Sequence, residues 1–153
     1  MAKLLTGTHA RLLDLSLLLL RLTVGIILFL VGAGKVLGWF GGQGLSPTIL
    51  GYNKMGFVTP LAYLSSFTEL FGGLLLIAGL MTRPAAFAVM INMFVATRVM
   101  LPHGFIFGMA AYPFSLMISA ILILLAGPMA FSVDALLLRT RQNPSGIQAS
   151  KIA

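Results

Sequence analysis

The chain has 153 residues, of which 59% are hydrophobic and only 8% are charged, and its mean hydropathy of +1.04 excludes an ordinary water-soluble domain. The net charge of +7 is dispersed along the chain, so no nucleic-acid partner is expected. The absence of cysteine excludes disulfide relays, iron–sulfur clusters and thioether-linked haem within this polypeptide. The two histidines, His9 and His103, are expected at opposite faces of the membrane, so no intrinsic metal site is expected.

Four apolar stretches are each close to the ~20 residues that a helix needs to cross the hydrocarbon core. They comprise residues 15–40, 60–80, 84–101 and 111–130. We therefore predict an all-α membrane protein, a bundle of four transmembrane helices within residues 15–138. The expected location is the plasma (inner) membrane, with the lipid bilayer as the first partner.

The ends of the chain are polar. Residues 1–14 mix leucines with charged residues, which is typical of a short helix on the membrane surface or simply of the start of the first span. Residues 139–153 are expected to form a flexible tail.

Basic residues gather on the side of both termini, whereas loop 41–59 has only Lys54, so the positive-inside rule predicts cytoplasmic termini. Loops 41–59 and 102–110 then face outward.

Two cations and two glycines share one narrow stripe of the first predicted helix at about 100° per residue. They are Arg21, Gly25, Gly32 and Lys35. Each cation alone is consistent with a long side chain that extends to the membrane–water interface. Because both cations lie on one face of the helix, however, we expect this face to point into the bundle interior. In the same helix Gly34 and Gly38 read GxxxG, which fits either a homodimer or close packing within one bundle.

The first loop, residues 41–59, is rich in glycine and contains Pro47, which argues against regular structure there. Its apolar residues nevertheless predict that it folds back as a cap over the outer mouth of the bundle. Between the second and third spans only residues 81–83 intervene, which predicts a tight antiparallel hairpin.

Glu69 is the only acidic side chain within the predicted spans, and an ionisable group at that depth indicates a functional site. Gly72 and Gly73 follow at i+3 and i+4, which predicts a groove beside the carboxylate. An unpaired ionised carboxylate is unfavourable in hydrocarbon, so it must pair with a cation or carry a proton. Counting residues from the helix ends predicts a long reach to Lys35, with a water or a substrate between the two groups.

The third predicted helix places Asn92 at about the depth of the carboxylate, where it either links two helices or contacts a ligand. Arg98 and His103 lie near the outer end of this helix, and Tyr112 begins a mildly polar strip on the fourth helix.

Arg21, Lys35 and Arg98 make three cations in or near the hydrocarbon against the single carboxylate of Glu69. This surplus of positive charge favours a small anion or a quinone oxygen as the ligand over a cation.

Taken in chain order, these residues resemble the DoxX family of small four-helix membrane proteins over about residues 17–138. The motifs that match are Arg21, Gly25, Gly32 and Lys35, then residues 69–73 (ELFGG) and 79–80, then Ala96 and residues 103–105 (HGF), and finally residues 127–128 and 132–134 (SVD). One position departs from the family. Many relatives have an acid at the start of the fourth helix, where this chain has Tyr112 and Pro113.

The resemblance implies a membrane protein linked to redox chemistry. Relatives are described as oxidoreductases, as small subunits of thiosulfate:quinone oxidoreductase, or as anchors of oxidative-stress complexes. It therefore implies a quinone as cofactor, and soluble or membrane redox subunits as partners.

Our leading hypothesis is an outward-facing polar pocket in which Arg21 and Lys35 hold an anion or quinone oxygen and Glu69 passes a proton. The other residues expected to contact the ligand are Gly72, Gly73, Asn92, Arg98, His103 and Tyr112. Two other functions fit the same residues: a non-catalytic anchor or assembly subunit of a redox complex, and a small proton-coupled transporter.

Overall fold

The structure is a computed structural model of the chain, and it describes residues 2–106, 109–127 and 132–135, with side chains from residue 12 onward. Every regular element within these ranges is helical, which confirms the all-α prediction for them. The elements are α1 (Ala2–Leu37), α2 (Leu45–Lys54), α3 (Thr59–Ala78), α4 (Thr82–Met100), the 3₁₀ turn η1 (Leu101–His103) and α5 (Ala111–Ala126). The tail predicted for residues 139–153 lies outside the described part of the chain.

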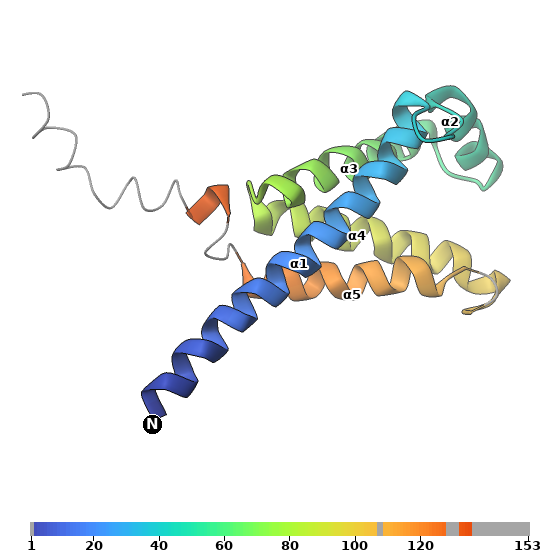
Figure 1. Cartoon of the computed structure of the whole chain (residues 1–153). Coiled ribbons are helices and arrows are strands. Elements are labelled where there is room, and N and C mark those ends of the chain that lie inside the picture. The colour runs from blue at the N-terminus through green and yellow to red at the C-terminus, as the bar shows by residue number, and fades with distance from the viewer. Residues whose placement is uncertain (1, 107–108, 128–131, 136–153) are drawn as a thin grey trace, which may run out of the picture.

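Helix α1 runs without a break through residue 14, where the sequence had suggested a boundary. Its 36 residues extend for ~54 Å, well beyond the ~30 Å of a hydrocarbon core. In Figure 1 the N-terminal part of α1 therefore projects past the other helices. At the other end the helix stops at Leu37, so Trp39 and Phe40 lie in the following turn rather than in the span.

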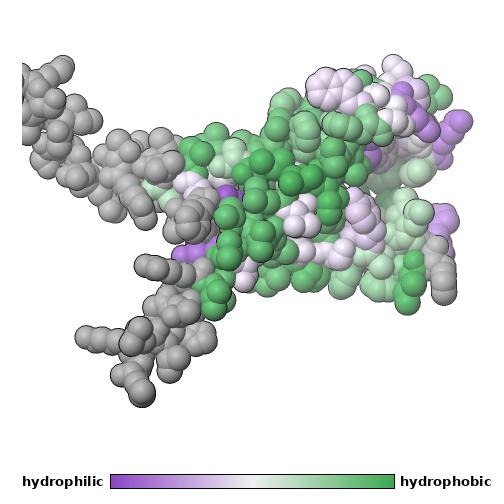
Figure 2. Space-filling model, viewed as in Figure 1, coloured by the Kyte–Doolittle hydropathy of each residue, from purple (hydrophilic) through white to green (hydrophobic). Residues whose placement is uncertain are grey.

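Three stretches are long and apolar enough to cross a membrane, namely Leu12–Leu37, Thr59–Ala78 and Thr82–His103. Helix α5 is equally apolar but has only 16 residues, which corresponds to ~24 Å. Figure 2 shows apolar side chains over the flank of the bundle and hydrophilic residues gathered at its two ends. Length, composition and surface pattern together define a membrane protein with three full-length spans and a shorter fourth apolar helix.

The α1–α3 contact brings two helix backbones unusually close because glycines meet there. A Cβ atom on Gly73 would lie 2.5 Å from the backbone nitrogen of Phe29, and one on Gly32 would collide with the backbone of Leu70. Beside these glycines, the core continues through Leu28 of α1 and Leu76 of α3 to Val89 of α4. The stripe from Arg21 to Lys35 faces this interior, as the sequence predicted.

The first loop contains a ten-residue helix, α2, so the expectation of irregular structure throughout residues 41–59 was wrong. Two glycines flank this helix, since Gly44 precedes it with a φ of 80° and Gly56 follows it with a φ of 88°, whereas Gly51 lies within it. Helix α2 packs against α1 and α3, and its Ile49 is buried.

The GxxxG pair of α1 is covered by the chain itself. Gly34 lies against Gly42, and the backbone N–H of Gly44 donates to the carbonyl of Gly34 over 3.1 Å. Gly38 adopts a φ of 72° beyond the end of the helix, so the two glycines do not form a continuous helical face. The motif thus shapes the turn into α2 and offers no surface for the homodimer that the sequence had suggested.

At the opposite end of the bundle, Asp134 caps α4. Its carboxylate accepts hydrogen bonds of 2.9 Å from the backbone N–H groups of Met81 and Thr82 and from the Thr82 hydroxyl. Met81 has a φ of 49°, a strained value for a residue with a side chain, so this cap holds the tight α3–α4 turn. Partial burial opposes ionisation, but the hydrogen bonds from Thr82 and Met81 and the positive charge of Arg21 outweigh it and lower the pKa of Asp134.

The lowered pKa predicts an acid-sensitive fold. The cap is fully effective above the ordinary carboxylate pKa of about 3.9 and is lost as the pH falls through the lower value of the folded protein. Asp134→Ala should cost ~1 kcal/mol at neutral pH and much less in acid. Melting temperatures in detergent at neutral and acidic pH measure this difference. Asp14→Asn in α1 serves as the control, and an equal loss for Asp134→Ala at both pH values would contradict the capping role.

Candidate functional site

Glu69 of α3 and Lys35 of α1 form a direct ion pair inside the bundle. The Lys35 Nζ lies 2.8 Å from Oε1, to which it donates a hydrogen bond, and 2.7 Å from Oε2. The Glu69 side chain is only 5% exposed and that of Lys35 27% exposed. The expected pairing with a cation is therefore confirmed, whereas the expected long reach with a water or a substrate between the groups was wrong.

Helix register explains the short contact. Gly32 lies against the backbone of Glu69 and Leu70, so Lys35 stands only one helical turn, or ~5 Å, above the level of the carboxylate. The sequence estimate assumed that α1 and α3 end at the same depth. In fact α1 stops deeper in the bundle, and the chain continues outward as the turn and α2.

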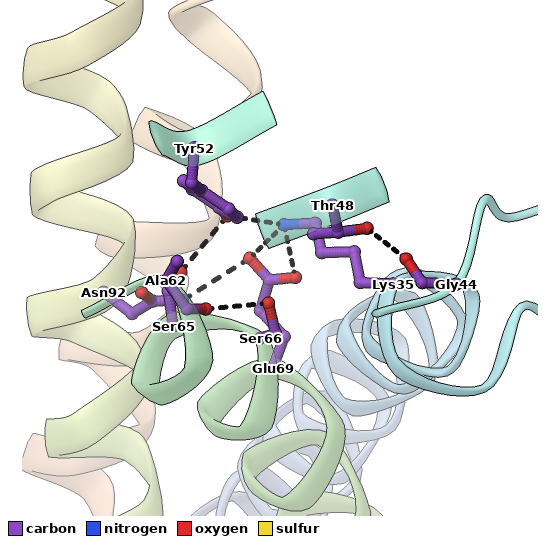
Figure 3. Close-up of polar contacts among 9 residues, drawn as sticks. All are labelled: Lys35, Gly44, Thr48, Tyr52, Ala62, Ser65, Ser66, Glu69 and Asn92. Atoms are coloured by element: carbon purple, nitrogen blue, oxygen red, sulfur yellow. Dashed lines mark hydrogen bonds and ion pairs between the residues drawn. The ribbon is translucent and has the colours of Figure 1, made fainter. Parts of the chain in front are cut away.

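Further polar side chains surround the ion pair, as Figure 3 shows. The Lys35 ammonium also donates to the Tyr52 hydroxyl of α2 over 3.1 Å, and this hydroxyl lies 3.3 Å from that of Ser65. From α4, the Asn92 amide donates to Glu69 Oε1 over 3.4 Å. The second oxygen, Oε2, is buried and lies 2.7 Å from the same ammonium. Both carboxylate oxygens are thus engaged with Lys35, within a ring of hydroxyl and amide groups.

A pocket of about 580 Å³ opens beside this cluster, a volume typical of small-molecule and cofactor sites. Helices α1 to α5 all contribute to its wall. Its polar lining consists of Lys35, Tyr52, Ser65, Thr68, Glu69, Asn92 and Tyr112, and the rest is aliphatic, aromatic, methionine or proline. Lys35 and Glu69 are the only charged residues in the lining, so the described pocket has no net charge.

The other predicted cations lie elsewhere. Arg21 is buried, but its guanidinium lies against Gly79 and near Asp134. It is separated from Lys35 by 14 positions of α1, or ~21 Å. Arg98 and His103 are exposed and do not line the pocket. The surplus of positive charge inferred from the sequence is therefore absent from the pocket.

Gly72 and Gly73 serve helix packing rather than a ligand groove. A Cβ atom on Gly72 would lie 2.9 Å from the Val89 side chain, and Gly73 faces α1. Asn92 and Tyr112 do line the pocket, and so does Pro113. The structure thus brings together Glu69, Lys35, Asn92 and Tyr112 from the predicted set and leaves out the two glycines, Arg21, Arg98 and His103.

Sequence reasoning missed Tyr52 and Ser65. Tyr52 lies in the loop that was expected to be irregular, so no helical periodicity was sought there. Ser65 did carry a signal, because it precedes Glu69 by one helical turn on the same face of α3. Tyr52 carried no such signal, because its place in the site depends on how α2 packs against α1 and α3.

The fold and the cluster define a helical membrane protein with a polar pocket inside the bundle. A protein-family model described as DoxX matches residues 16–108, which is more than half of the chain. The chain therefore belongs to the DoxX family, as the motifs had indicated. It is also 29% identical over 133 residues to the protein named "Putative oxidoreductase CatD" of Bacillus subtilis (strain 168), an alignment that covers 85% of this chain and 92% of that protein. No solved structure matches the chain significantly.

A double-mutant cycle tests the ion pair. Lys35→Met leaves a buried carboxylate without its cation, and the free energy of unfolding should fall by ~3 kcal/mol, the lower end of the usual range because Lys35 is partly exposed. Lys35→Met/Glu69→Gln removes both charges and should recover most of that loss. Unfolding in detergent measures these two variants and Glu69→Gln alone, and additive losses would show that the two side chains do not interact.

Proposed function

We propose that this protein is the membrane component of a quinone-linked redox system and that the pocket binds the quinone ring. The observation that supports the proposal most strongly is the neutral Lys35–Glu69 pair at the wall of a largely apolar pocket. A quinone has neutral carbonyl oxygens on an apolar ring. Its oxygens match the polar part of the pocket lining, and its ring matches the apolar part. The name of the Bacillus subtilis relative supports redox chemistry in general.

In this proposal the donors and the carboxylate have separate roles. The Lys35 ammonium and the Tyr52 hydroxyl hold a quinone oxygen, because both are donors in the pocket wall. Glu69 passes a proton as the charge on that oxygen changes, since its carboxylate lines the pocket beside the ammonium. Arg21, which the sequence had placed beside Lys35, has no part in this site.

The electrons come from another subunit. Reduction of a quinone to a quinol takes up two electrons and two protons, and this polypeptide has no cysteine to ligate an iron–sulfur cluster. We therefore include a redox-active partner subunit as the electron donor. In this arrangement the protein binds the quinone, excludes water and moves the proton.

The proposed location is the plasma (inner) membrane with both termini in the cytoplasm. The basic residues on the terminal side of the spans support this orientation. The end of the bundle that contains Arg21, Arg83 and Asp134 then faces the cytoplasm, and α2 with the ion pair lies toward the outer face.

Glu69→Gln tests the proposed function. Loss of the carboxylate should weaken binding of a decyl-chain benzoquinone by at least ~10-fold, which corresponds to about 1.4 kcal/mol, and should abolish its reduction in membranes that contain the partner subunit. Equilibrium titration in nanodiscs measures the binding, and a melting curve verifies the fold.

The matched control is Arg98→Gln, because Arg98 is charged, exposed and outside the pocket wall. It should bind the quinone as the wild type does. Wild-type binding and reduction by Glu69→Gln would refute the proposal. Wild-type binding without any reduction would favour a non-catalytic anchor, and flux driven by a proton gradient in proteoliposomes would favour a transporter.

A further inference from the structure

The pocket has a mouth in the flank of the bundle. Its wall includes Leu61 and Leu64 of α3, which are 51% and 63% exposed. On α4 it includes Phe87, Ile91 and Val95, which are 41–51% exposed. Residues that are both exposed and part of the pocket wall mark its openings. These five lie within membrane-spanning helices, whereas Met55, Met109 and Tyr112, which are 58%, 74% and 48% exposed, lie outside these spans and mark a second opening. The opening between α3 and α4 therefore faces the acyl chains of the bilayer.

We call this opening the α3–α4 crevice and define it by Leu61, Leu64, Phe87, Ile91 and Val95. On α4 the crevice extends from Phe87 to Val95, which corresponds to ~12 Å along the helix axis. That length is about 40% of the ~30 Å hydrocarbon core. The crevice thus accommodates the first part of an extended hydrocarbon tail.

Small side chains keep this part of the pocket open. Ala88 and Ala96 of α4 both contribute to the wall, and Ala88 is exposed. The methionines Met55, Met93, Met100 and Met109 line the rest of the apolar part, and their flexible side chains adapt to tails of different shape.

Polar and apolar groups are segregated within the pocket. Lys35, Tyr52, Ser65, Glu69 and Asn92 form one cluster that is connected by hydrogen bonds. The residues that define the crevice are all apolar. A ligand that satisfies both regions has a small polar head and a single apolar tail. Because the Lys35–Glu69 pair is neutral as a whole, a head without net charge fits it better than an ionised one.

We propose that the pocket takes its ligand sideways from the bilayer through the α3–α4 crevice, and that this ligand is a single-tailed amphiphile with an uncharged, hydrogen-bonding head. The head reaches the Lys35–Glu69 cluster while the tail stays in the crevice. This inference deepens the proposed function, since a tailed quinone belongs to this class, but the entry route can be tested without any redox reaction.

The native chain has no cysteine, so a single introduced thiol reports on the pocket without background. Ala96→Cys places it in the partly buried pocket wall, and Leu50→Cys places it on α2, where Leu50 is 59% exposed. In proteoliposomes a membrane-impermeant charged maleimide and a lipid-soluble maleimide are compared. The lipid-soluble reagent should label Ala96→Cys, whereas the impermeant reagent should label only Leu50→Cys. Equal labelling of both sites by the impermeant reagent would overturn lateral entry.

A second pair of variants tests the crevice itself. Ala88→Phe, added to Ala96→Cys, narrows the crevice at an exposed position and should slow labelling by the lipid-soluble maleimide at least tenfold. Val95→Trp should act in the same way. The matched control is Ala78→Phe, which makes the same change at an exposed position of α3 outside the pocket wall. Equal labelling rates for Ala88→Phe, Val95→Trp and Ala78→Phe would overturn the route.

Protection by dodecan-1-ol tests the ligand class. This neutral alcohol has a single tail and no redox chemistry, and it should protect Ala96→Cys, whereas butan-1-ol at equal membrane concentration should not. Lack of protection by the longer alcohol would overturn the proposed class. Protection by dodecan-1-ol without quinone reduction would leave lateral entry intact and reject the redox function. Quinone reduction together with unrestricted labelling by the impermeant reagent would reject lateral entry and leave the redox function intact.

Discussion

The contact between Lys35 and Glu69 is the interaction on which the polar cluster inside this bundle depends. A carboxylate in the middle of an apolar helix is unfavourable unless a cation reaches it, and here a single ammonium lies within 2.8 Å of both oxygens. The pair joins α1 to α3. In addition, Lys35 donates a hydrogen bond to Tyr52 of α2, and Glu69 accepts one from Asn92 of α4. Four helices are thereby held around one neutral cluster, next to a pocket that all of them line.

Glycine makes this contact geometrically accessible. Side chains at Gly32 or Gly73 would force α1 and α3 apart, and Lys35 would then stand farther from the carboxylate. The close backbone approach also sets the register that places Lys35 one turn above Glu69. Small residues at helix interfaces usually serve packing in membranes. In this protein the same packing fixes the distance between two charged groups.

The two ends of the bundle differ in role: one contains a structural helix cap, and the other contains the pocket of the proposed function. At one end Asp134 caps a strained turn and lies near Arg21, and the space that the described residues leave beside Arg21 is only about 10 Å³. At the other end the Lys35–Glu69 pair borders about 580 Å³. Arg21 lies near the Asp134 cap and Arg98 lies outside the pocket wall, which explains why a sum over all intramembrane cations misjudged the charge of the site.

The sequence by itself determined the membrane environment, the helical class, the family, and the position of Glu69 as the single acidic residue of the predicted spans, because composition and helical periodicity are local properties. It also identified the inward stripe from Arg21 to Lys35. Only the tertiary structure decided which cation pairs with the carboxylate, because depth depends on where α1 ends and on its register against α3. The role of Gly72 and Gly73 in packing, the entry of Tyr52 into the site and the mouth between α3 and α4 likewise depend on contacts between segments distant in sequence. A pattern along one helix predicts which residues share a face, but the neighbouring helix determines what that face contacts.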